Sequence, residues 1–428
     1  MKKFFNLIGA SVLAFAVASC SNEEGSTLER VNTRAVTVIT DNVTSSTTWS
    51  GEIELANKIA VEGQGVTLTI QPGTIIRGRS TGTPQDATAL IITKGAKIHA
   101  VGTSSNPIVM TAKNGQRGGW GGLVILGKAP VNQPQPLYIE GIVPNSLSGV
   151  DTSYGGSDPD DDSGILQYVR VEYAGATIGL NNELNSFTLG GVGRGTTIDH
   201  CQAYYGDDDG FEFFGGTVNA DHLVAIGTTD DSFDFDFGYS GTIQFAVSTV
   251  ASVGLTSDPN GIECDNENPY AGSTPYTHPV LSNLTIIGST SGTSLKSAVN
   301  FRRGTQFTLV NSVLYGFPTG ILLQDINTNP TPSSILKSNV ICSTTSGQEI
   351  SGLTSAVDAS GNSLVAVNGI QLTDPWGNYK SMDLAPVEDT PAYSGTHFTG
   401  LTGLEVVTYK GAIDPDDFPS WLDEDWVR

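Results

Sequence analysis

The amino-acid sequence predicts an all-β fold, a right-handed parallel β-helix whose short strands stack as coils along one axis. One unit occurs twice in succession, because Asp199–Ala203 and Asp208–Phe213 return 22 residues later as Asp221–Ala225 and Asp230–Phe235. A constant step of this size is typical of stacked units that bury their apolar faces against one another.

Apolar and polar residues alternate within each copy of this unit, which is the periodicity of a β-strand. The alternating runs are Phe211-Glu212-Phe213 and Phe233-Asp234-Phe235-Asp236. We therefore expect the phenylalanines to point into the coils and the carboxylates to point outward, and no helical period fits these segments.

Two further repeats extend the pattern along the chain. The 22-residue step recurs earlier in the chain, where similar residues follow one another at this distance: Leu68, Ile70, Gly73 and Ile76, then Leu90, Ile92, Gly95 and Ile98. Later, Asn283, Asn311 and Asn339 follow one another at 28 residues. A constant strand with a return loop of variable length would give both steps, and Asn, Asp and Gly suit the corners of such coils.

The composition favours one long solenoid over several globular domains, since the 428 residues include 51 glycines and only 15% are charged. The net charge is −23 and the isoelectric point is about 4.4. The sequence has no basic patch of useful size, which argues against nucleic acid as a partner. Such acidity suits a surface protein or one that collects divalent cations.

The N-terminal residues predict export and lipidation. Residues 1–19 are interpreted as a signal peptide, because Lys2 and Lys3 precede an apolar run, Phe4–Ala18, that is too short to span a membrane. The run ends in Val17-Ala18-Ser19-Cys20, which resembles a bacterial lipobox. This resemblance implies cleavage before Cys20 and diacylation at that residue, with palmitate as a typical acyl group.

Residues 20–35 would then form the lipidated cysteine and a flexible tether. The segment Ser21-Asn22-Glu23-Glu24 is similar to the export signals of surface-displayed lipoproteins. We therefore expect a protein anchored by lipid in the outer membrane and facing the cell exterior. Retention on the periplasmic leaflet is the alternative.

Three cysteines remain after the lipidated one, namely Cys201, Cys264 and Cys342. An odd number cannot form a complete disulfide framework. Each lies among alternating apolar residues, so we expect buried free thiols inside the solenoid and favour this over a metal or redox role.

The solenoid is expected to occupy residues 36–373, with an irregular capping strand from Val36 towards Trp49 at its N-terminal end. The period breaks between residues 128 and 164. Four prolines forbid a central strand there and predict an inserted loop: Pro130, Pro134, Pro136 and Pro144.

The inserted loop ends in an acidic run that contains Asp158, Asp160 and Asp162. Alternate aspartates of this kind could wrap one calcium ion, which prefers six to eight oxygen ligands by its usual coordination. The glycine lies one position later than in an EF-hand loop, and no closing glutamate follows. A solvated turn is the alternative.

Residues 374–428 lose the period and are expected to form a C-terminal cap. Its aromatic residues would pack over the last coil as a plug, with a sugar-stacking platform as the competing interpretation. These residues are Trp376, Tyr379, Phe398, Tyr409, Phe418, Trp421 and Trp426.

Several motifs along the chain point to a known family. They include Pro72-Gly73-Thr74, Gly119-Trp120-Gly121-Gly122, Leu189-Gly190-Gly191-Val192-Gly193 and Phe214-Gly215-Gly216. Together they resemble bacterial right-handed β-helix surface lipoproteins, a largely uncharacterised group. The resemblance implies the fold over nearly the whole mature chain and implies no particular activity.

Stacking of the coils would place equivalent carboxylates at the spacing of neighbouring strands, about 4.8 Å. Glu212, Asp234 and Glu263 would form one outward column, with Asp208 over Asp230 and Asp209 over Asp231 beside it. Such carboxylates repel one another unless a cation or protons intervene. The sequence therefore predicts a calcium site with ligands drawn from Asp208, Asp209, Glu212, Asp230, Asp231, Asp234 and Asp236. The alternative is that the paired aspartates cap turns.

Two short segments add an enzymatic alternative. Ile198-Asp199-His200-Cys201 followed by Asp209-Gly210 is similar to part of the pectate lyase pattern, and Gly206-Asp207-Asp208 to part of the polygalacturonase pattern. The further motifs of both families are missing. These likenesses make Asp208, Asp209, Glu212 and Arg302 weak catalytic candidates.

The predicted function is that of an outer-membrane surface lipoprotein whose β-helix binds carbohydrate or another extracellular ligand with calcium. The expected ligand-binding residues are His200, His222, Glu212, Asp234 and Glu263, although the place of the two histidines at strand starts favours a packing role for them. A calcium-dependent polysaccharide lyase or glycoside hydrolase is one alternative. A protein-binding scaffold or adhesin is another, because one fold can carry all three functions.

Overall fold

The computed structural model describes residues 35–428 except 81–85, 143, 145–146, 180–181, 251–253, 257, 267–271, 290–293, 327–333, 356, 367, 370 and 377–381. The described residues belong to one unit, Ala35–Arg428. The predicted signal peptide, Cys20 and nearly all of the tether lie outside them. Within the described part, no helix is long and apolar enough to cross a membrane.

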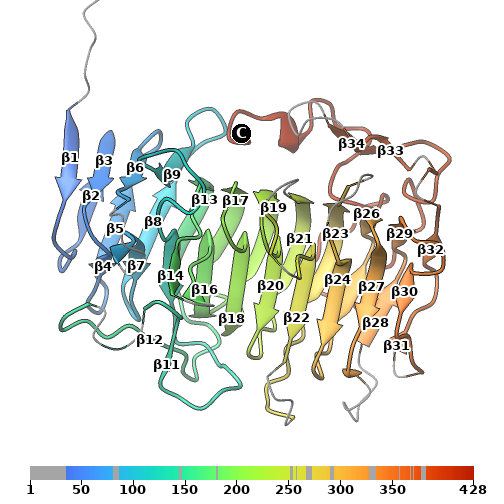
Figure 1. Ribbon diagram of the computed structural model, residues 1–428, viewed down its shortest axis with the longest axis horizontal. Helices are drawn as coiled ribbons and strands as arrows, with labels where there is room; N and C mark the ends of the chain where they lie inside the picture. The colour runs from blue at the N-terminus through green and yellow to red at the C-terminus, as the bar shows by residue number, and fades with distance from the viewer. Residues whose placement is uncertain are drawn as a thin grey trace, which may run out of the picture. The chain divides into compact units, whose positions relative to one another are not determined.

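Parallel strands follow one another as stacked coils, so the predicted parallel β-helix is confirmed (Figure 1). We call the 18-stranded sheet the first sheet. Its strands are β1 (Val36–Ile39), β2 (Thr47–Trp49), β3 (Glu52–Leu55), β5 (Thr67–Ile70), β6 (Ile75–Gly78), β8 (Lys97–Val101), β9 (Ile108–Ala112), β13 (Gly164–Glu172), β17 (Thr197–Tyr204), β19 (Asn219–Thr228), β21 (Thr242–Val250), β23 (Val280–Ile287), β25 (Thr308–Val310), β26 (Val313–Phe317), β28 (Ser334–Lys337), β29 (Val340–Ser343), β31 (Val357–Asp358) and β32 (Ser363–Leu364).

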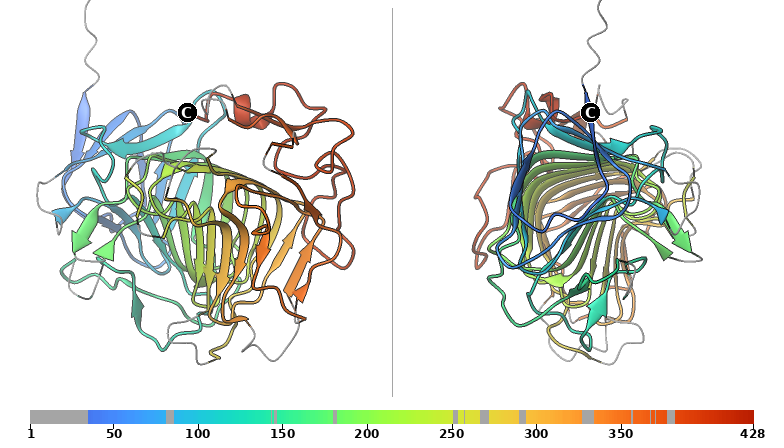
Figure 2. Two further views of the ribbon diagram at one scale, coloured as in Figure 1. Left: turned by 45° about the vertical axis from the view of Figure 1, so that its right-hand side comes forward. Right: turned by 90° about the vertical axis from the view of Figure 1, so that its left-hand side faces the viewer.

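The 10-stranded sheet is called the second sheet and also runs along the whole series of coils (Figure 2). Its strands are β4 (Ile59–Val61), β7 (Leu90–Ile92), β10 (Leu123–Leu126), β16 (Phe187–Val192), β18 (Phe211–Gly216), β20 (Phe233–Asp236), β22 (Ile262–Asp265), β24 (Ser297–Arg302), β27 (Thr319–Leu323) and β30 (Ile350–Ser351). Outside the coils, the described residues include three antiparallel pairs and the short 3₁₀ helix η3: β11 (Leu137–Tyr138) with β12 (Ser153–Tyr154), β14 (Thr177–Gly179) with β15 (Asn182–Glu183), β33 (Leu372–Asp374) with β34 (Asp383–Pro386), and η3 (Trp421–Asp423).

The strand register confirms the 22-residue repeat in the middle of the chain, since Asp199 pairs with Asp221 and Phe211 with Phe233. The earlier 22-residue repeat is wrong as a register. Leu68 pairs with Ile98 in the first sheet, whereas Leu90 lies in the second sheet. The two motifs match because any half-buried strand alternates apolar residues, whichever sheet it joins.

A row of residues with left-handed backbone marks the bend that each coil makes within the first sheet. Their φ angles lie between 51° and 56°, and the strand pairing skips each of them. The row consists of Tyr168, His200, His222, Phe245, Asn283, Asn311 and Ser338. Non-glycine residues adopt this backbone at a cost, so the stacked side chains must compensate. Two of the three repeated asparagines, Asn283 and Asn311, belong to this row, whereas Asn339 lies one position beyond Ser338.

Aromatic rings stacked between the two sheets fill the interior of the coils. The ring centroids of Phe187 and Phe211 are 4.5 Å apart, and those of Phe211 and Phe233 are 5.6 Å apart. Phe211 and Phe233 are fully buried, as predicted from the alternation. All three cysteines outside the signal region are free and buried. Cys201 and Cys264 lie in this interior, but Cys342 packs outside the coils beneath the C-terminal segment, contrary to prediction.

The segment inserted between β10 and β13 folds over the outer face of the second sheet. Its hairpin of β11 and β12 brings Ile139 and Tyr154 against Val124 and Phe214 of the coils. The centroids of the Tyr154 and Phe214 rings are 6.2 Å apart. This apolar contact covers the outer face next to the acidic part of the sheet.

The C-terminal segment does not plug the last coil, so that prediction is wrong. Residues 382–428, here called the strap, run back along the outer face of the first sheet, as the red segment of Figure 1 shows. Asn283 donates a hydrogen bond to the Tyr409 carbonyl at 3.0 Å, and Asn311 one to the His397 carbonyl at 3.1 Å. Side chains at the bends of the coils therefore hold the strap.

The aromatic residues predicted to form the plug are spread along this path. Trp376 packs on Tyr315 just before the strap, and Trp421 and Trp426 pack on the histidines of β17 and β19. Phe418 is 90% exposed. Tyr379 lies outside the described residues. At the N-terminal end, β1 pairs with β3 as part of the first coil.

Candidate functional site

The outer face of the second sheet carries the predicted column of carboxylates. Glu212 pairs with Asp234, Asp234 with Glu263, and Glu263 with Asn300. The alternation of each strand places these side chains outside while the phenylalanines fill the interior. They are not in an open groove, however, because Glu212 and Glu263 are buried and Asp234 is half-buried.

A second row, formed by Asp209 and Asp231, lies at the turns that enter β18 and β20. The Asp231 amide donates to Asp209 Oδ1 at 2.8 Å, and the Asn260 amide donates to Asp231 Oδ1 at 2.5 Å. The Asp209 amide in turn donates to Asn185 Oδ1 at 3.2 Å. Each side chain therefore caps the turn of the following coil, which is the role that the turn-capping alternative predicts.

The two rows, together with Asp208 and Asp230 beside them, form three overlapping clusters of carboxylates. Within each cluster, one ligand oxygen from every residue lies within 4.8 Å of the others. The clusters are Asp208, Asp209 and Asp230; Asp209, Glu212 and Asp234; and Asp231, Asp234 and Glu263. Turn capping uses only part of this set. The Oδ1 atoms of Asp234 and Asp236 are buried and have no hydrogen-bond partner among the described residues.

Burial and mutual repulsion raise the pKa of the clustered carboxyls. For Asp209 and Asp234 burial is the main cause, followed by the charges of their acidic neighbours. Burial likewise raises the pKa of Glu212, although a hydrogen bond from Asn185 opposes the shift. Burial raises the pKa of Glu263 to about 7 against the attraction of Arg302. The clustered carboxyls therefore favour a proton or a cation near neutral pH.

Cationic side chains lie only at the β24 end of this cluster, within the described part of the chain. Arg302 forms ion pairs with Glu263 and with Asp265, whose Oδ2 lies 3.1 Å from Arg302 Nε. Arg303 also pairs with Asp265. The predicted catalytic candidate Arg302 is thus beside the carboxylates. Its guanidinium is already shared between two of them.

Four members of the site were not predicted from the sequence: Asn185, Asn260, Asn300 and Asp265. Asn185 accepts a hydrogen bond from the Asp209 amide, and the Asn260 amide donates one to Asp231. Asn300 pairs with Glu263 in the strand register. Loops of different lengths precede them, so no constant spacing marks them. Asp265, two residues after Glu263 on the same outward face, was the one with a usable signal.

A protein-family model, the pectate-lyase-like β-helix domain, matches residues 38–377. The chain belongs to this family. Membership suggests a carbohydrate-related or surface function. A search of curated proteins gave no match. The family match ends before the strap, so the strap is a part of this pectate-lyase-like β-helix that the family model does not include.

The two histidines do not join the carboxylate column in this pectate-lyase-like β-helix, contrary to the predicted ligand-binding set. His200 and His222 lie on the first sheet, stacked at 4.3 Å and 21°, and both approach Asp199 Oδ1, at 2.7 and 2.9 Å. Trp421 of the strap packs against both rings. The strap therefore covers the face on which they would meet a carbohydrate.

Asp199, His200 and His222 also bring three possible metal ligands together. Both Nδ1 atoms, however, already face the same Asp199 oxygen, so they have a partner within the cluster. Burial opposes ionisation of Asp199, but the two neighbouring histidines, His222 through a hydrogen bond, lower its pKa. The arrangement is that of a packed hydrogen-bonded cluster.

The structure does not bring together the three aspartates of the predicted calcium loop of the pectate-lyase-like β-helix. Asp158 caps the Asp160 amide at 3.1 Å, and Asp162 caps the Gly164 amide at 2.8 Å. Asp162 further pairs with Lys97 at 2.5 Å, and Asp160 with Arg194 at 3.4 Å. Each carboxylate serves a separate partner at the surface, so the three do not converge on one ion. The buried member of the run is Asp161.

Proposed function

We propose that this protein is a lipid-anchored surface β-helix that binds calcium in the carboxylate clusters of its second sheet and binds carbohydrate. The unpartnered, buried Oδ1 atom of Asp234, which belongs to two of the clusters, carries the calcium part of the proposal. A buried polar atom without a partner costs free energy, and a divalent cation with oxygen ligands would remove that cost. Family membership supports the carbohydrate part.

The residues that would hold calcium are those of the three overlapping clusters. Asp209 and Asp234 each belong to two clusters, so an ion near either could share ligands with its neighbour. Calcium accepts carboxylate oxygens in flexible geometry, and every residue of the set offers them. Bound there, calcium would neutralise the repulsion between stacked strands. Its role would be to stabilise the coils and to hold the acidic face in one form.

Carbohydrate binding and calcium binding are tested together. The protein is applied to a glycan array in calcium and again in EDTA, and hits are measured with Asp234→Asn and Glu212→Gln variants. We expect binding to at least one polysaccharide class that weakens in EDTA and in both variants. Binding to no glycan in either buffer would contradict the carbohydrate part while leaving the calcium part to the melting series described in the Discussion.

A calcium-dependent polysaccharide lyase is the second candidate, favoured by the position of Arg302 beside Glu263 and Asp265. A guanidinium close to a bound cation could position the carboxylate of an acidic sugar. The test is the release of unsaturated oligosaccharides from uronate polymers, followed by ultraviolet absorbance. Activity should disappear in EDTA and in Arg302→Ala. Glycan binding without any product would exclude it.

The outer-membrane anchor is proposed from the lipobox at Cys20, which lies outside the described residues. We expect Cys20→Ala to move the protein from the membrane fraction to the soluble fraction, because the acyl chains would be its hydrophobic anchor. Surface exposure is checked by protease digestion of intact cells. A Cys20→Ala protein that still sediments with membranes would contradict the anchor.

A further inference from the structure

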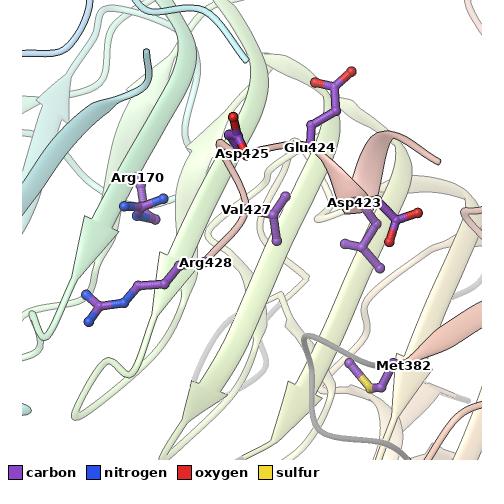
Figure 3. Close-up of a pocket in the computed structure, with 8 residues that line it drawn as sticks. Arg170, Met382, Asp423, Glu424, Asp425, Val427 and Arg428 are labelled. Atoms are coloured by element: carbon purple, nitrogen blue, oxygen red, sulfur yellow. The ribbon is translucent and has the colours of Figure 1, made fainter. Parts of the chain in front are cut away.

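Two adjoining cavities lie on the strap, away from the carboxylate clusters. Their volumes are about 420 Å³ and about 390 Å³. Both are lined by Met382, Leu422 and Asp423, so they form one depression, here called the strap groove. In Figure 3, Asp423, Glu424 and Asp425 lie along one side of the first cavity, Met382 lies opposite, and Arg170 and Arg428 lie at one end.

Aliphatic side chains form part of the floor of the strap groove, whose exposed lining is otherwise mostly polar. Leu384 and Ile413 are buried beneath it, and Pro386 and Pro415 extend it. Phe418 lines the same cavity and is 90% exposed. A large apolar side chain exposed beside a cavity marks an interaction site, because burying it in a complex is favourable.

The rim of the strap groove is acidic. It contains five carboxylates: Asp383, Asp417, Asp423, Glu424 and Asp425. Arg170 and Arg428 offer the opposite charge only at one end, and both already pair with Glu172 at 2.6 Å. One rim oxygen, Glu424 Oε2, is buried without a hydrogen-bond partner in the described part of the chain. An apolar floor inside a negative rim complements a ligand with an apolar centre and positive flanks.

We propose that the strap groove is a docking site for a cationic peptide segment of a partner protein, with one apolar anchor residue flanked by Lys or Arg. The aliphatic, irregular floor fits a single side chain, whereas sugar rings prefer flat aromatic surfaces with convergent hydrogen bonds. The rim repels anionic polymers. The site does not depend on calcium or on the carboxylate clusters.

The probe is a fluorescein-labelled peptide of alternating lysine and leucine, titrated against the full mature chain at physiological salt. The rim variant is Asp417→Asn/Asp425→Asn. The control is Glu388→Gln/Asp389→Asn, which makes the same charge change at exposed strap positions that do not line the groove. We expect one peptide per protein, binding weakened at least about fivefold by the rim variant, and binding within about twofold of wild type in the control.

The apolar anchor is tested with a lysine–serine peptide of equal charge and with Ala385→Trp, which would fill the groove. Both should weaken binding by at least about tenfold. If the Ala385→Trp protein does not fold, the rim variant and the lysine–serine peptide still test the proposal. Equal losses in the rim and control variants, or equal binding of the two peptides, would overturn the proposal. So would a chitosan oligomer that binds the groove more tightly than the lysine–leucine peptide, since the partner would then be an amino sugar.

Discussion

Asp209 and Glu212 are three residues apart in the sequence, but Asp209 caps a turn and Glu212 belongs to the outward column of carboxylates. Asp209 Oδ1 accepts the amide of Asp231 in the next coil and so fixes a turn. Glu212 faces outward from a strand and receives a hydrogen bond from Asn185. Turn capping needs only an acceptor oxygen, whereas cation binding needs the negative charge. Substitutions that keep one property and remove the other can therefore separate the two roles.

The first prediction uses this difference at Asp209. Asp209→Asn keeps an acceptor for the Asp231 amide, so without calcium it should leave the free energy of unfolding unchanged or higher. Asp209→Ala removes the acceptor and should cost about 1–3 kcal/mol, because the buried amide is left unpaired. Chemical denaturation in EDTA measures both. Equal losses in the two variants would contradict the capping role.

A second prediction concerns Phe233, which is stacked on Phe211 and fully buried. Phe233→Ala should cost roughly 3–5 kcal/mol of unfolding free energy, the range for emptying a packed aromatic position. Phe418→Ala is the control, because this side chain is 90% exposed and should change stability by at most about 0.5 kcal/mol. Similar small losses at both positions would show that Phe233 does not fill the interior.

At the scale of strands and loops, the sequence predicts register where consecutive coils have equal lengths. The match of Asp199 with Asp221 and of Phe211 with Phe233 is of this kind. The match of Leu68 with Leu90 fails because the two residues belong to different sheets, and alternation alone does not say which sheet a strand joins. Equal spacing of two motifs indicates that their strands pair when the turn residues repeat together with the strand residues.

The candidate site, like the strand register, could be predicted only in part. Glu212, Asp234 and Glu263 stack as expected because their strands align. Asn185 and Asn260 were missed because they come from turns whose lengths vary. Two further features had no sequence signal: the covering of the second sheet by the inserted segment, and the path of the strap. Prolines and the loss of the sequence repeat indicate that a segment leaves the coils, but they do not indicate which face of the coils it covers.

The third prediction concerns the strap. Trp426 is fully buried, with its ring 6.1 Å from Tyr168 and 5.4 Å from His200. Trp426→Ala should remove contacts worth roughly 3–5 kcal/mol and so release the end of the strap from the first sheet. Limited proteolysis should then cut the strap faster than in wild type or in Phe418→Ala, while the coils keep their melting temperature. Loss of the coils together with the strap would show that both unfold as one unit.

At the scale of the whole molecule, a net charge of −23 is distributed unevenly. The second sheet concentrates carboxylates whose pKa values are raised by burial. The strap of the first sheet carries a second acidic region around an apolar floor. Repulsion within the first region lowers stability unless protons or cations are bound there.

The fourth prediction is the pH dependence of stability without divalent ions. Raised pKa values mean that the folded protein binds protons that the unfolded chain has released. The stabilisation that these bound protons give the folded state is complete below the pKa of the unfolded chain, near 4. It is lost as pH rises through the pKa of the folded state. Burial raises the pKa of Glu263 to about 7, so this residue alone could contribute about 3 kcal/mol. In EDTA the melting temperature should fall between pH 5 and about pH 8. A constant or rising melting temperature over that range would contradict the raised values.

The central claim is that the overlapping carboxylates of the second sheet bind calcium, and a melting series in calcium tests it most directly. A ligand that binds only the folded state adds about 2.7 kcal/mol at a concentration one hundred times its dissociation constant, so the wild-type melting temperature should rise with calcium at neutral pH. Asp234→Asn should blunt that rise and melt no lower than wild type in EDTA. Asp158→Asn, in the surface loop, should keep the full rise. A wild-type melting temperature that does not change with calcium, or an equal rise in both variants, would contradict the claim.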